Sequence, residues 1–305
     1  MSGSGSSSSG ASKGNLRIGA VFPQTEIGND PRGIKEYAIG VQELGFRHIL
    51  AYDHVLSGSQ RAHHPKLVKR YDENSPFHEV FVLFGYLAAI VPELELVTGV
   101  LVLPQRQTAL VAKQAATLDV LTGGKTRIGV GIGWNDIEYQ GLGAQFNNRG
   151  KRMEEQIDVL RTLWNDPIIS YDGTWHTVEH AGLAPMPVQR PISLWIGGSA
   201  EVAVRRAVRL ADGFFPNPSP RATYERLIAI IDDEMRAIGR DPATFGIEPR
   251  ISAAGTSADD RNQSVAWWRE QGITHLTVNT MGAGFTSISQ HLDALESVIT
   301  GLAGQ

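Results

Sequence analysis

The sequence contains no cysteine among its 305 residues. This absence excludes disulfides, thiolate metal sites, iron–sulfur clusters and a cysteine nucleophile. An excess of positive charge is also missing, because 28 Lys and Arg stand against 32 Asp and Glu and give a net charge of −4. Dedicated nucleic-acid-binding proteins are usually basic, so we expect no nucleic-acid partner.

Long apolar runs are absent as well. The strongest apolar window, Val80–Val91, ends at Pro92 and is shorter than a membrane-spanning helix. Residues 1–14 contain seven Ser and four Gly and lack the apolar core of a signal peptide. We interpret them as a flexible tail added for expression. We therefore expect a soluble, cytoplasmic protein with no membrane partner, in which residues 15–305 form a single domain.

Strand and helix patterns alternate along the rest of the chain. Apolar, β-rich segments predict eight strands, over Leu16–Pro23, His48–Asp53, Leu94–Pro104, Lys125–Ile132, Ile192–Ile196, Gly213–Phe215, Phe245–Ser252 and Ile273–Asn279. Each is followed by a predicted helix, over Pro31–Leu44, Phe77–Val91, Thr108–Leu121, Asn148–Trp164, Ala200–Leu210, Arg221–Ile238, Arg261–Gln271 and Ser287–Leu302.

Eight such units in one domain favour an α/β fold, a closed (β/α)8 TIM barrel. The pattern pauses after the fourth unit, where Ile168–Gln189 predicts a small hairpin with Asp172 and Gly173 in its turn. We therefore expect an insertion at this place. A polar loop is expected after the second strand, through about Ser75.

Residues directly after the strands are the candidates for chemistry, because catalytic groups of such barrels lie at the carboxyl ends of the strands. The second strand leads to Asp53 and His54, which are either a proton-handling pair or a pair that orders a loop. Gly99, inside the third strand, marks either a bulge beside a flat ligand or simple packing.

The fourth and fifth strands end in glycine-rich segments. Gly129, Gly131 and Gly133 alternate at the end of the fourth strand and would make space for a ligand, but Asp136 stands where a dinucleotide fingerprint needs glycine. Gly197-Gly198-Ser199 precedes a helix and forms either a phosphate cradle or an ordinary helix cap.

Other polar residues give weaker signals. Arg205 and Arg206 could assist a phosphate at the cradle or be solvated. The histidine pairs, His63 with His64 and His176 with His180, lack the neighbouring carboxylates of a convincing metal site, so we predict no metal. The serine-hydrolase elbow and the Walker loop are both absent from the sequence.

Three stretches of the chain resemble the bacterial luciferase-like flavin and deazaflavin oxidoreductases. They are residues 103–164 (LPQRQTALVAKQAATLDVLTGGKTRIGVGIGWND and onward), residues 191–216 (PISLWIGGSAEVAVRRAVRLADGFFP) and YDHV at 52–55. The likeness extends over about residues 16–300. It implies an eightfold barrel with an insertion after the fourth unit, and a flavin-like cofactor in the barrel mouth.

The resemblance also implies which residues border the cofactor. It places Asp53 and His54 beside the ring, a non-prolyl cis peptide at about Val100-Leu101 beneath it, Gly131 to Trp134 along its other side, and the phosphate at Gly197, Gly198 and Ser199. Leu103, at the end of the third strand, and Gly133 belong to the same implied set. Glu138 matches a recurrent family glutamate that either takes part in the site or only braces its helix.

The resemblance leaves three functions open. The first is a hydride transfer that depends on the deazaflavin coenzyme F-420 (F420), with His54 and Asp53 as catalytic residues; the second is an FMN-dependent monooxygenase; the third is a non-catalytic flavin-binding barrel. Trp134 and Asn135 replace the carboxylate that sugar-phosphate dehydrogenases of the family carry, which argues against that substrate.

The substrate is expected to be a small molecule, in a pocket shaped by the loop Leu56–Pro76 and by the insertion. Family likeness also implies a homodimer. Four basic residues of the second loop could hold an anionic cofactor tail or form a solvated face: Arg61, Lys66, Lys69 and Arg70.

Overall fold

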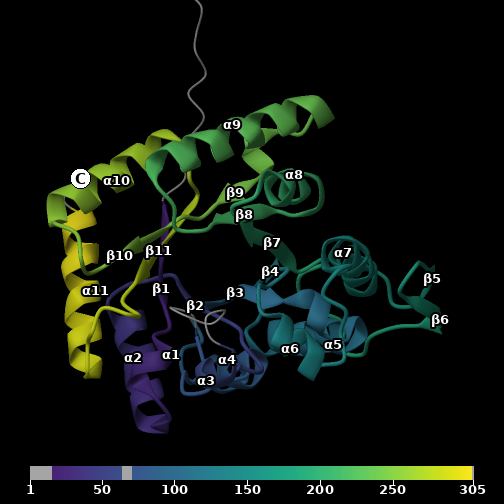
Figure 1. Cartoon of the computed structure of the whole chain (residues 1–305), viewed down its shortest axis with the longest axis horizontal. Coiled ribbons are helices and arrows are strands. Elements are labelled where there is room, and N and C mark those ends of the chain that lie inside the picture. Colours follow the sequence, from purple (N-terminus) through teal and green to yellow (C-terminus); the bar gives the residue numbers. More distant parts are fainter. Residues whose placement is uncertain (1–15, 64–70, 304–305) are drawn as a thin grey trace, which may run out of the picture.

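The computed structural model describes residues 16–63 and 71–303 of the chain. The serine- and glycine-rich tail and the basic residues Lys66, Lys69 and Arg70 lie outside these ranges. Within them, strands and helices alternate in an α/β fold (Figure 1). The main sheet has nine strands in the order β10-β11-β1-β2-β3-β4-β7-β8-β9, and every neighbouring pair is parallel.

The strands of the main sheet are β1 (Arg17–Val21), β2 (His48–Ala51), β3 (Glu95–Val102), β4 (Thr126–Gly131), β7 (Ser193–Gly198), β8 (Gly213–Pro216), β9 (Gly246–Ile247), β10 (Arg250–Ser252) and β11 (His275–Asn279). Two further strands, β5 (Ile169–Asp172) and β6 (Thr177–Ala181), form a separate antiparallel hairpin.

The helices are α1 (Gln24–Ile27), α2 (Pro31–Glu43), α3 (Gln60–His63), α4 (Val80–Ala88), α5 (Thr108–Leu121), α6 (Asp136–Gly141), α7 (Arg149–Asn165), α8 (Glu201–Leu210), α9 (Arg221–Ile238), α10 (Ala258–Glu270) and α11 (Ile288–Ala303). Two short 3-10 turns lie at Leu103–Gln105 and Pro242–Thr244.

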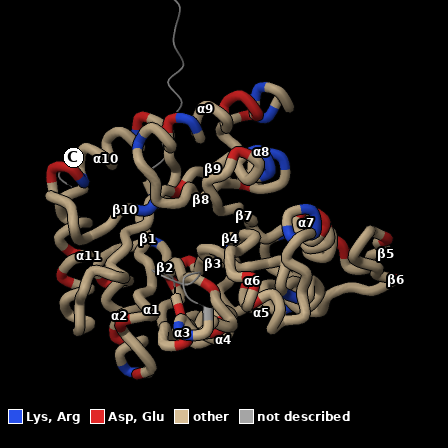
Figure 2. Tube along the Cα trace, in the orientation of Figure 1, with Lys and Arg blue, Asp and Glu red and all other residues tan. Residues whose placement is uncertain are grey.

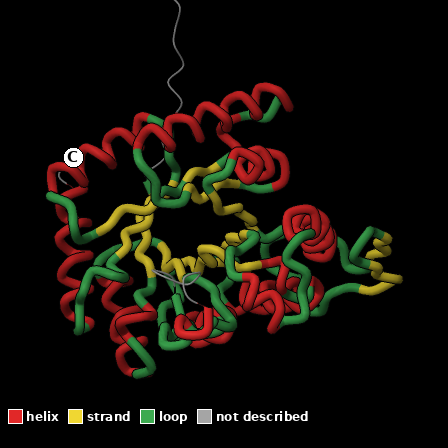
Figure 3. Tube along the Cα trace, in the orientation of Figure 1, coloured by secondary structure: helices red, strands yellow, loops and turns green. Residues whose placement is uncertain are grey.

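The sheet curls, so that helices cover its outer side and strands surround its inner side (Figure 3). Its two ends meet on one segment, residues 246–252. The backbone N–H of Glu248 donates to Phe214 O of β8, while Pro249 O accepts from Thr277 N of β11. The first half of the segment therefore pairs with one end of the sheet and the second half with the other.

The predicted strand Phe245–Ser252 was wrong in one respect, because it is broken into β9 and β10. Glu248 and Pro249 lie between the two pieces, and proline has no N–H to continue a ladder. The other predicted strands are observed with shifts of a few residues at their ends. The sequence patterns missed the short helices α1, α3 and α6, of which α3 falls inside the predicted polar loop.

Apolar side chains fill the space between the sheet and the helices. The apolar stretch of α4 is part of this core, with Phe84 and Leu87 fully buried. None of the helices in the described residues is long and apolar enough to cross a membrane. Charged residues of both signs are frequent on α7, α8 and α9, on the outside of the fold (Figure 2).

The β5–β6 hairpin projects to one side of the sheet, between α7 and β7 in the chain (Figure 1). His176 fastens it to the main body, since its ring lies 2.8 Å from Glu155 Oε1 and 2.6 Å from Thr108 Oγ1. Both ring nitrogens of His176 thus have partners in the main body, whereas Nδ1 of His180 lies 3.3 Å from Ser170 Oγ within the hairpin.

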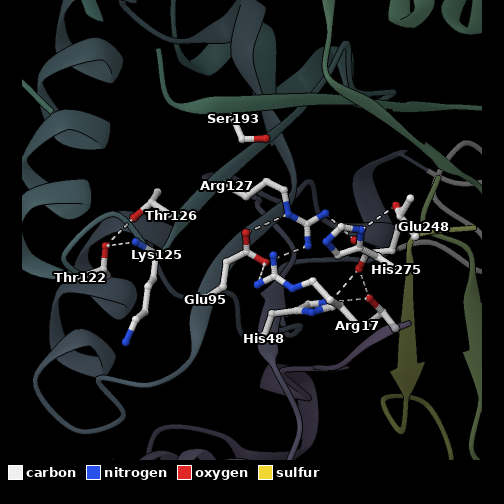
Figure 4. Close-up of polar contacts among 12 residues, drawn as sticks. Arg17, His48, Glu95, Thr122, Lys125, Thr126, Arg127, Ser193, Glu248 and His275 are labelled. Atoms are coloured by element: carbon white, nitrogen blue, oxygen red, sulfur yellow. Dashed lines mark hydrogen bonds and ion pairs between the residues drawn. The ribbon is translucent and has the colours of Figure 1, made fainter. Parts of the chain in front are cut away.

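A buried ionic network joins the amino ends of several strands (Figure 4). Arg127 of β4 is 2% exposed and donates to both oxygens of Glu95 on β3, at 3.3 and 3.2 Å. Its remaining guanidinium nitrogen donates to Glu248 at 2.5 Å, and His48 Nε2 lies 2.8 Å from the other oxygen of Glu248. One cation therefore connects β3, β4 and the segment on which the sheet ends meet.

The pKa values of this network follow from its pairing. Burial alone would raise the pKa of Glu248, but Arg127 and His48 outweigh it and hold that pKa well below its usual range. Burial and the charge of Arg127 together lower the pKa of His275 to about 3. The network therefore holds charged carboxylates and a neutral His275 at neutral pH.

Arg127→Met should lower the free energy of unfolding by about 3–5 kcal/mol, because it leaves Glu248 buried without its cation. Lys125→Met is the matched control. It removes the same kind of charge two residues earlier, where Lys125 pairs with the exposed Glu93 at 3.1 Å, and should cost less than about 1 kcal/mol. Urea denaturation followed by circular dichroism measures the unfolding free energy of both variants. Equal losses of stability would contradict the structural role given to the buried pair of Arg127 and Glu248.

Stability should also fall as the pH drops below about 6.5. In that range the unfolded chain binds a proton at His275 that the native protein does not bind until about pH 3. His275 should therefore contribute about 2 kcal/mol to the loss of unfolding free energy between pH 7.5 and pH 5. In the His275→Gln variant, the unfolding free energy should fall by about 2 kcal/mol less between these two pH values, as urea denaturation would measure. The same pH dependence in the variant and the original protein would contradict the lowered pKa of His275.

Candidate functional site

A cavity of about 610 Å³ opens at the carboxyl ends of the strands. We call it the mouth cavity. Its walls come from the ends of β2, β3, β4, β7, β8, β10 and β11 and from nearby loops. The lining residues are Thr25, Tyr52, Asp53, His54, Tyr71, Gly99, Val100, Val102, Gly131, Ile132, Gly133, Trp134, Gly197, Gly198, Asn217, Pro218, Arg250, Asn279, Met281 and Gly282.

Most of the residues predicted for the site meet in this cavity. Asp53, His54, Val100, Gly131, Gly133, Trp134, Gly197 and Gly198 all line it. Leu101 and Leu103 do not, since both are fully buried in the hydrophobic core behind the wall. Ser199 is exposed and lies outside the lining residues.

Asp53 is held at the floor of the cavity by two partners. One carboxylate oxygen accepts from Arg106 at 2.7 Å and the other from the backbone N–H of Val102 at 3.0 Å. Burial raises the pKa of Asp53, and the charge and hydrogen bond of Arg106 oppose that increase. The two hydrogen bonds join the end of β2 to the β3 bulge and to Arg106, so Asp53 positions β3.

His54 pairs with Glu138, whose carboxylate is 1% exposed. The ring Nδ1 lies 3.2 Å from one carboxylate oxygen, and the other accepts from the backbone N–H groups of Val55 and Leu56. Burial would raise the pKa of Glu138, but these hydrogen bonds and His54 lower it, so the carboxylate stays ionised at neutral pH. A carboxylate at Nδ1 places the proton there, which leaves Nε2 for the cavity.

The short helix α6 positions Glu138. Asn135 caps it by accepting from Ile137 N at 3.2 Å, and the Asn135 amide also donates to Leu56 O. Glu138 and Asn135 together thus bind the chain after β2 to the chain after β4. The contacts of Glu138 reach beyond its own helix, since the residue braces the loop after β2 and contacts His54.

Three aromatic rings surround His54. The ring centroids of Phe77, Tyr71 and Trp134 lie 4.9, 5.5 and 5.9 Å from that of His54, and all three contacts are edge-to-face. These contacts fix the imidazole plane and keep water away from most of the ring, whose side chain is 10% exposed.

The predicted bulge in β3 is confirmed by a register shift between Thr98 and Leu101 against β4. The non-prolyl cis peptide is Gly99-Val100, one bond before the position that the family resemblance implied. The Val100 side chain then projects toward β4 and β7. A Cβ on Gly131 or Gly197 would come within 2.6 or 2.7 Å of it. These two glycines therefore make room for Val100, and the three residues form one continuous wall.

In the predicted phosphate cradle, the Ser199 side chain does not cap the following helix. Helix α8 begins at Glu201 with Ala200 in the capping position, so Ser199 does not cap it. Arg205 pairs with Glu201 and Glu234, and Arg206 pairs with Glu154, so both arginines serve helix-to-helix contacts. Residues 199 and 200, which precede the helix, are both exposed.

Sequence reasoning missed three residues of the site. Arg106 lies three residues after the third strand's Leu103, and its guanidinium pairs with both Asp53 and Glu79. Tyr52 and Arg250 line the cavity together, with the Arg250 guanidinium 5.2 Å from the Tyr52 ring centroid. Their positions at the ends of strands were the available signal. In residues 16–63 and 71–303 no group of three His, Asp or Glu could hold a metal ion.

The chain was compared with known families and proteins. The sequence model of the luciferase-like monooxygenase family matches residues 11–295. An uncharacterized protein of Mycobacterium tuberculosis (strain H37Rv) is 36% identical over 245 residues, which cover 79% of this chain and 82% of that protein. An FMNH2-dependent dimethylsulfone monooxygenase of Pseudomonas fluorescens is 32% identical over 159 residues, 51% of this chain and 42% of that enzyme.

The fold resembles that of solved structures. An F420-dependent secondary alcohol dehydrogenase superposes with a TM-score of 0.76 and 18% identity, over 94% of this chain and 99% of that one. At this identity the likeness shows the fold alone.

Glu138→Gln should loosen the segment after β2, because an amide cannot accept from both the backbone and the ring as the carboxylate does. Hydrogen bonds to charged groups are worth about 1.5–3 kcal/mol, so the amides of Val55 and Leu56 should exchange roughly 10- to 100-fold faster. Hydrogen–deuterium exchange by mass spectrometry on this segment measures the change.

Glu73→Gln is the control for this experiment. Glu73 also accepts from a backbone N–H, that of Gln60 at 3.1 Å, but it is exposed. Its replacement should leave exchange at Val55 and Leu56 unchanged. If both variants behave alike, Glu138 does not brace the segment.

Proposed function

The chain belongs to the luciferase-like monooxygenase family and is an enzyme, and from that premise we propose that it transfers a hydride between the deazaflavin coenzyme F420 and a small organic substrate. The observation that carries this proposal is the His54–Glu138 pair at the edge of the mouth cavity. Hydride transfer to or from an alcohol or carbonyl moves a proton as well, and an imidazole oriented by a carboxylate is suited to that task.

The volume and the shape of the mouth cavity support the proposal that it holds a flat cofactor. Its volume lies within the range of ligand sites, and one side is the smooth wall of Gly131, Val100 and Gly197. We propose that this wall, with Asp53, Gly133 and Trp134, contacts the ring system. The turn at Gly197, Gly198 and Ser199 would hold the phosphate through backbone N–H groups. When bound, the deazaflavin would supply the carbon that gives or takes the hydride.

The residues of the chain have separate roles in this proposal. His54 would hold or deliver the proton at Nε2, and Glu138 would keep its ring oriented. Asp53 would act by positioning the β3 bulge through Val102, so we assign it a supporting role in place of direct proton transfer. Leu101 and Leu103 would support the wall from the core. Arg61, which is exposed, remains a candidate for the anionic tail.

We also infer that the curled sheet is a closed (β/α)8 barrel. In this interpretation β9 and β10 are two halves of the seventh strand, because the segment 246–252 pairs with both ends of the sheet. The β5–β6 hairpin would then be an insertion after the fourth unit, as the sequence pattern predicts.

An FMN-dependent monooxygenase is the second candidate. The observation in its favour is the 32% identity with the FMNH2-dependent dimethylsulfone monooxygenase. Both cofactors carry the phosphate that the cradle would bind, so the cradle does not separate them. The matched region covers only 42% of the dimethylsulfone monooxygenase, and a monooxygenase and an F420-dependent dehydrogenase superpose equally well on this chain, each with a TM-score of 0.76, so the fold does not separate the two candidates either.

Titration of the protein with F420 and with FMN, followed by absorbance and by mass spectrometry of the complexes, separates the two. F420 should bind tighter, and its binding should weaken at high salt because exposed charge contacts of its tail are screened. Tighter binding of FMN, together with substrate-dependent consumption of oxygen, would replace the proposal with the monooxygenase.

The cradle is tested in the same titration. Ser199→Asp places a negative charge where the phosphate would bind. It should weaken the binding of either cofactor by about tenfold or more, a loss of roughly 1.4 kcal/mol in binding free energy. Ser170→Asp makes the same change on the exposed hairpin and should have no effect. An unaltered affinity in Ser199→Asp would place the phosphate elsewhere.

A further inference from the structure

Arg250 is a cation in the mouth cavity that has no ionic partner among the described residues. It belongs to β10 and lines the cavity, and its guanidinium carbon lies 5.2 Å from the Tyr52 ring centroid. Its Nε is buried and has no hydrogen-bond partner in the described part of the chain. An arginine of this kind is costly unless another group satisfies it.

The neighbouring carboxylates are already engaged. Asp53, the one acidic residue among those that line the cavity, is paired with Arg106. Glu26, near the loop after β11, accepts from the Thr25 hydroxyl at 2.8 Å and from Gly282 N at 2.6 Å. None of the carboxylates in the described residues therefore forms an ion pair with Arg250.

Arg250 also lies apart from the cradle that the proposed function assigns to the phosphate. Its contact with Tyr52 brings the guanidinium toward the end of β2. The cradle follows β7, which is separated from β2 by β3 and β4 and from the segment 246–252 by β8. The cavity thus has two places for anionic groups, one formed by backbone at Gly197–Ser199 and one formed by a guanidinium.

We propose that Arg250 is a substrate-binding residue that takes a carboxylate, so that the substrate of this enzyme is a small organic acid with an apolar or aromatic body. The proposal rests on the proposed function, since it assumes that the cofactor occupies the glycine-rich side. A planar guanidinium matches a carboxylate through two parallel hydrogen bonds.

The surroundings of Arg250 suit the rest of such a substrate. Tyr52, Tyr71 and Trp134 supply aromatic surface in the cavity, and His54 lies among them. Burial raises the pKa of Tyr71 to about 12, so its phenol stays protonated and can donate a hydrogen bond. A molecule anchored at Arg250 would extend its body along these rings toward His54.

Calorimetric titration with benzoate and with benzamide tests the proposal. The two probes have the same ring and differ in the charge of the head group. Benzoate should bind the protein alone and the protein saturated with F420, while benzamide should bind about tenfold more weakly or not at all. Equal affinities for the two probes would overturn the proposal.

Variants locate the binding. Arg250→Gln should weaken the binding of benzoate by about tenfold or more. Arg250→Lys should retain part of the affinity, because lysine keeps the positive charge but lacks the planar guanidinium. Arg221→Gln is the matched control, since Arg221 also stacks on an aromatic ring, at 4.7 Å from Trp267, but lies outside the residues lining the cavity. It should bind benzoate normally. Circular dichroism confirms that each variant is folded.

Titrations with the cofactors show whether Arg250 belongs to a substrate site or contacts the cofactor. Under the proposal, Arg250→Gln leaves the affinity for F420 and FMN unchanged, and benzoate does not compete with either. Competition, or a loss of cofactor affinity in this variant, would assign Arg250 to the cofactor and overturn the proposal. If neither cofactor binds but benzoate still requires Arg250, the carboxylate site stands and the proposed hydride transfer fails.

Discussion

The buried contact of Arg127 with Glu95 and Glu248 is the constraint on which the rest of the structure depends. Glu248 lies on the segment that pairs with both ends of the sheet, so this cation fixes the place where the sheet curls back on itself. Removing such charges from water is expensive, and only close pairing compensates for it. Because the amino ends of the strands are held in this way, their carboxyl ends can tolerate a bulge, glycines and an open cavity.

Much of the fold follows from local pattern. The alternation of apolar strands with helices predicts the main elements, because strand and helix periods differ along the chain. The break at Glu248-Pro249 was missed since an apolar run looks continuous across it, although the proline was a signal. The Arg127–Glu248 pair was also unpredictable, because it joins residues 121 positions apart whose contact depends on how the sheet curls.

The shared position of the candidate site residues follows for a similar reason. Parallel strands place their carboxyl ends at one edge, so Asp53, Gly131 and Gly197 had to lie near one another. What each residue does there depends on contacts across strands. Gly131 was expected to leave space for a ligand, but the Val100 side chain from the β3 bulge lies beside it. The sequence left open whether Asp53 handles a proton or orders a loop, and it gave no sign of the contact with Arg106.

The same contacts divide the mouth cavity into two chemically different halves. On the side of β3, β4 and β7 the wall is backbone and Val100, with the charge of Asp53 neutralised by Arg106. On the side of β10 and β2 lie Arg250, whose charge has no partner in the described residues, and the aromatic rings around His54. The smooth wall suits the flat ring of a cofactor, which backbone contacts would hold. The cation and the imidazole suit the substrate that reacts with that cofactor. Under the two proposals, such a division would keep cofactor binding independent of substrate choice. Substitutions near Arg250 could then change the substrate without disturbing the wall against which the cofactor is proposed to lie.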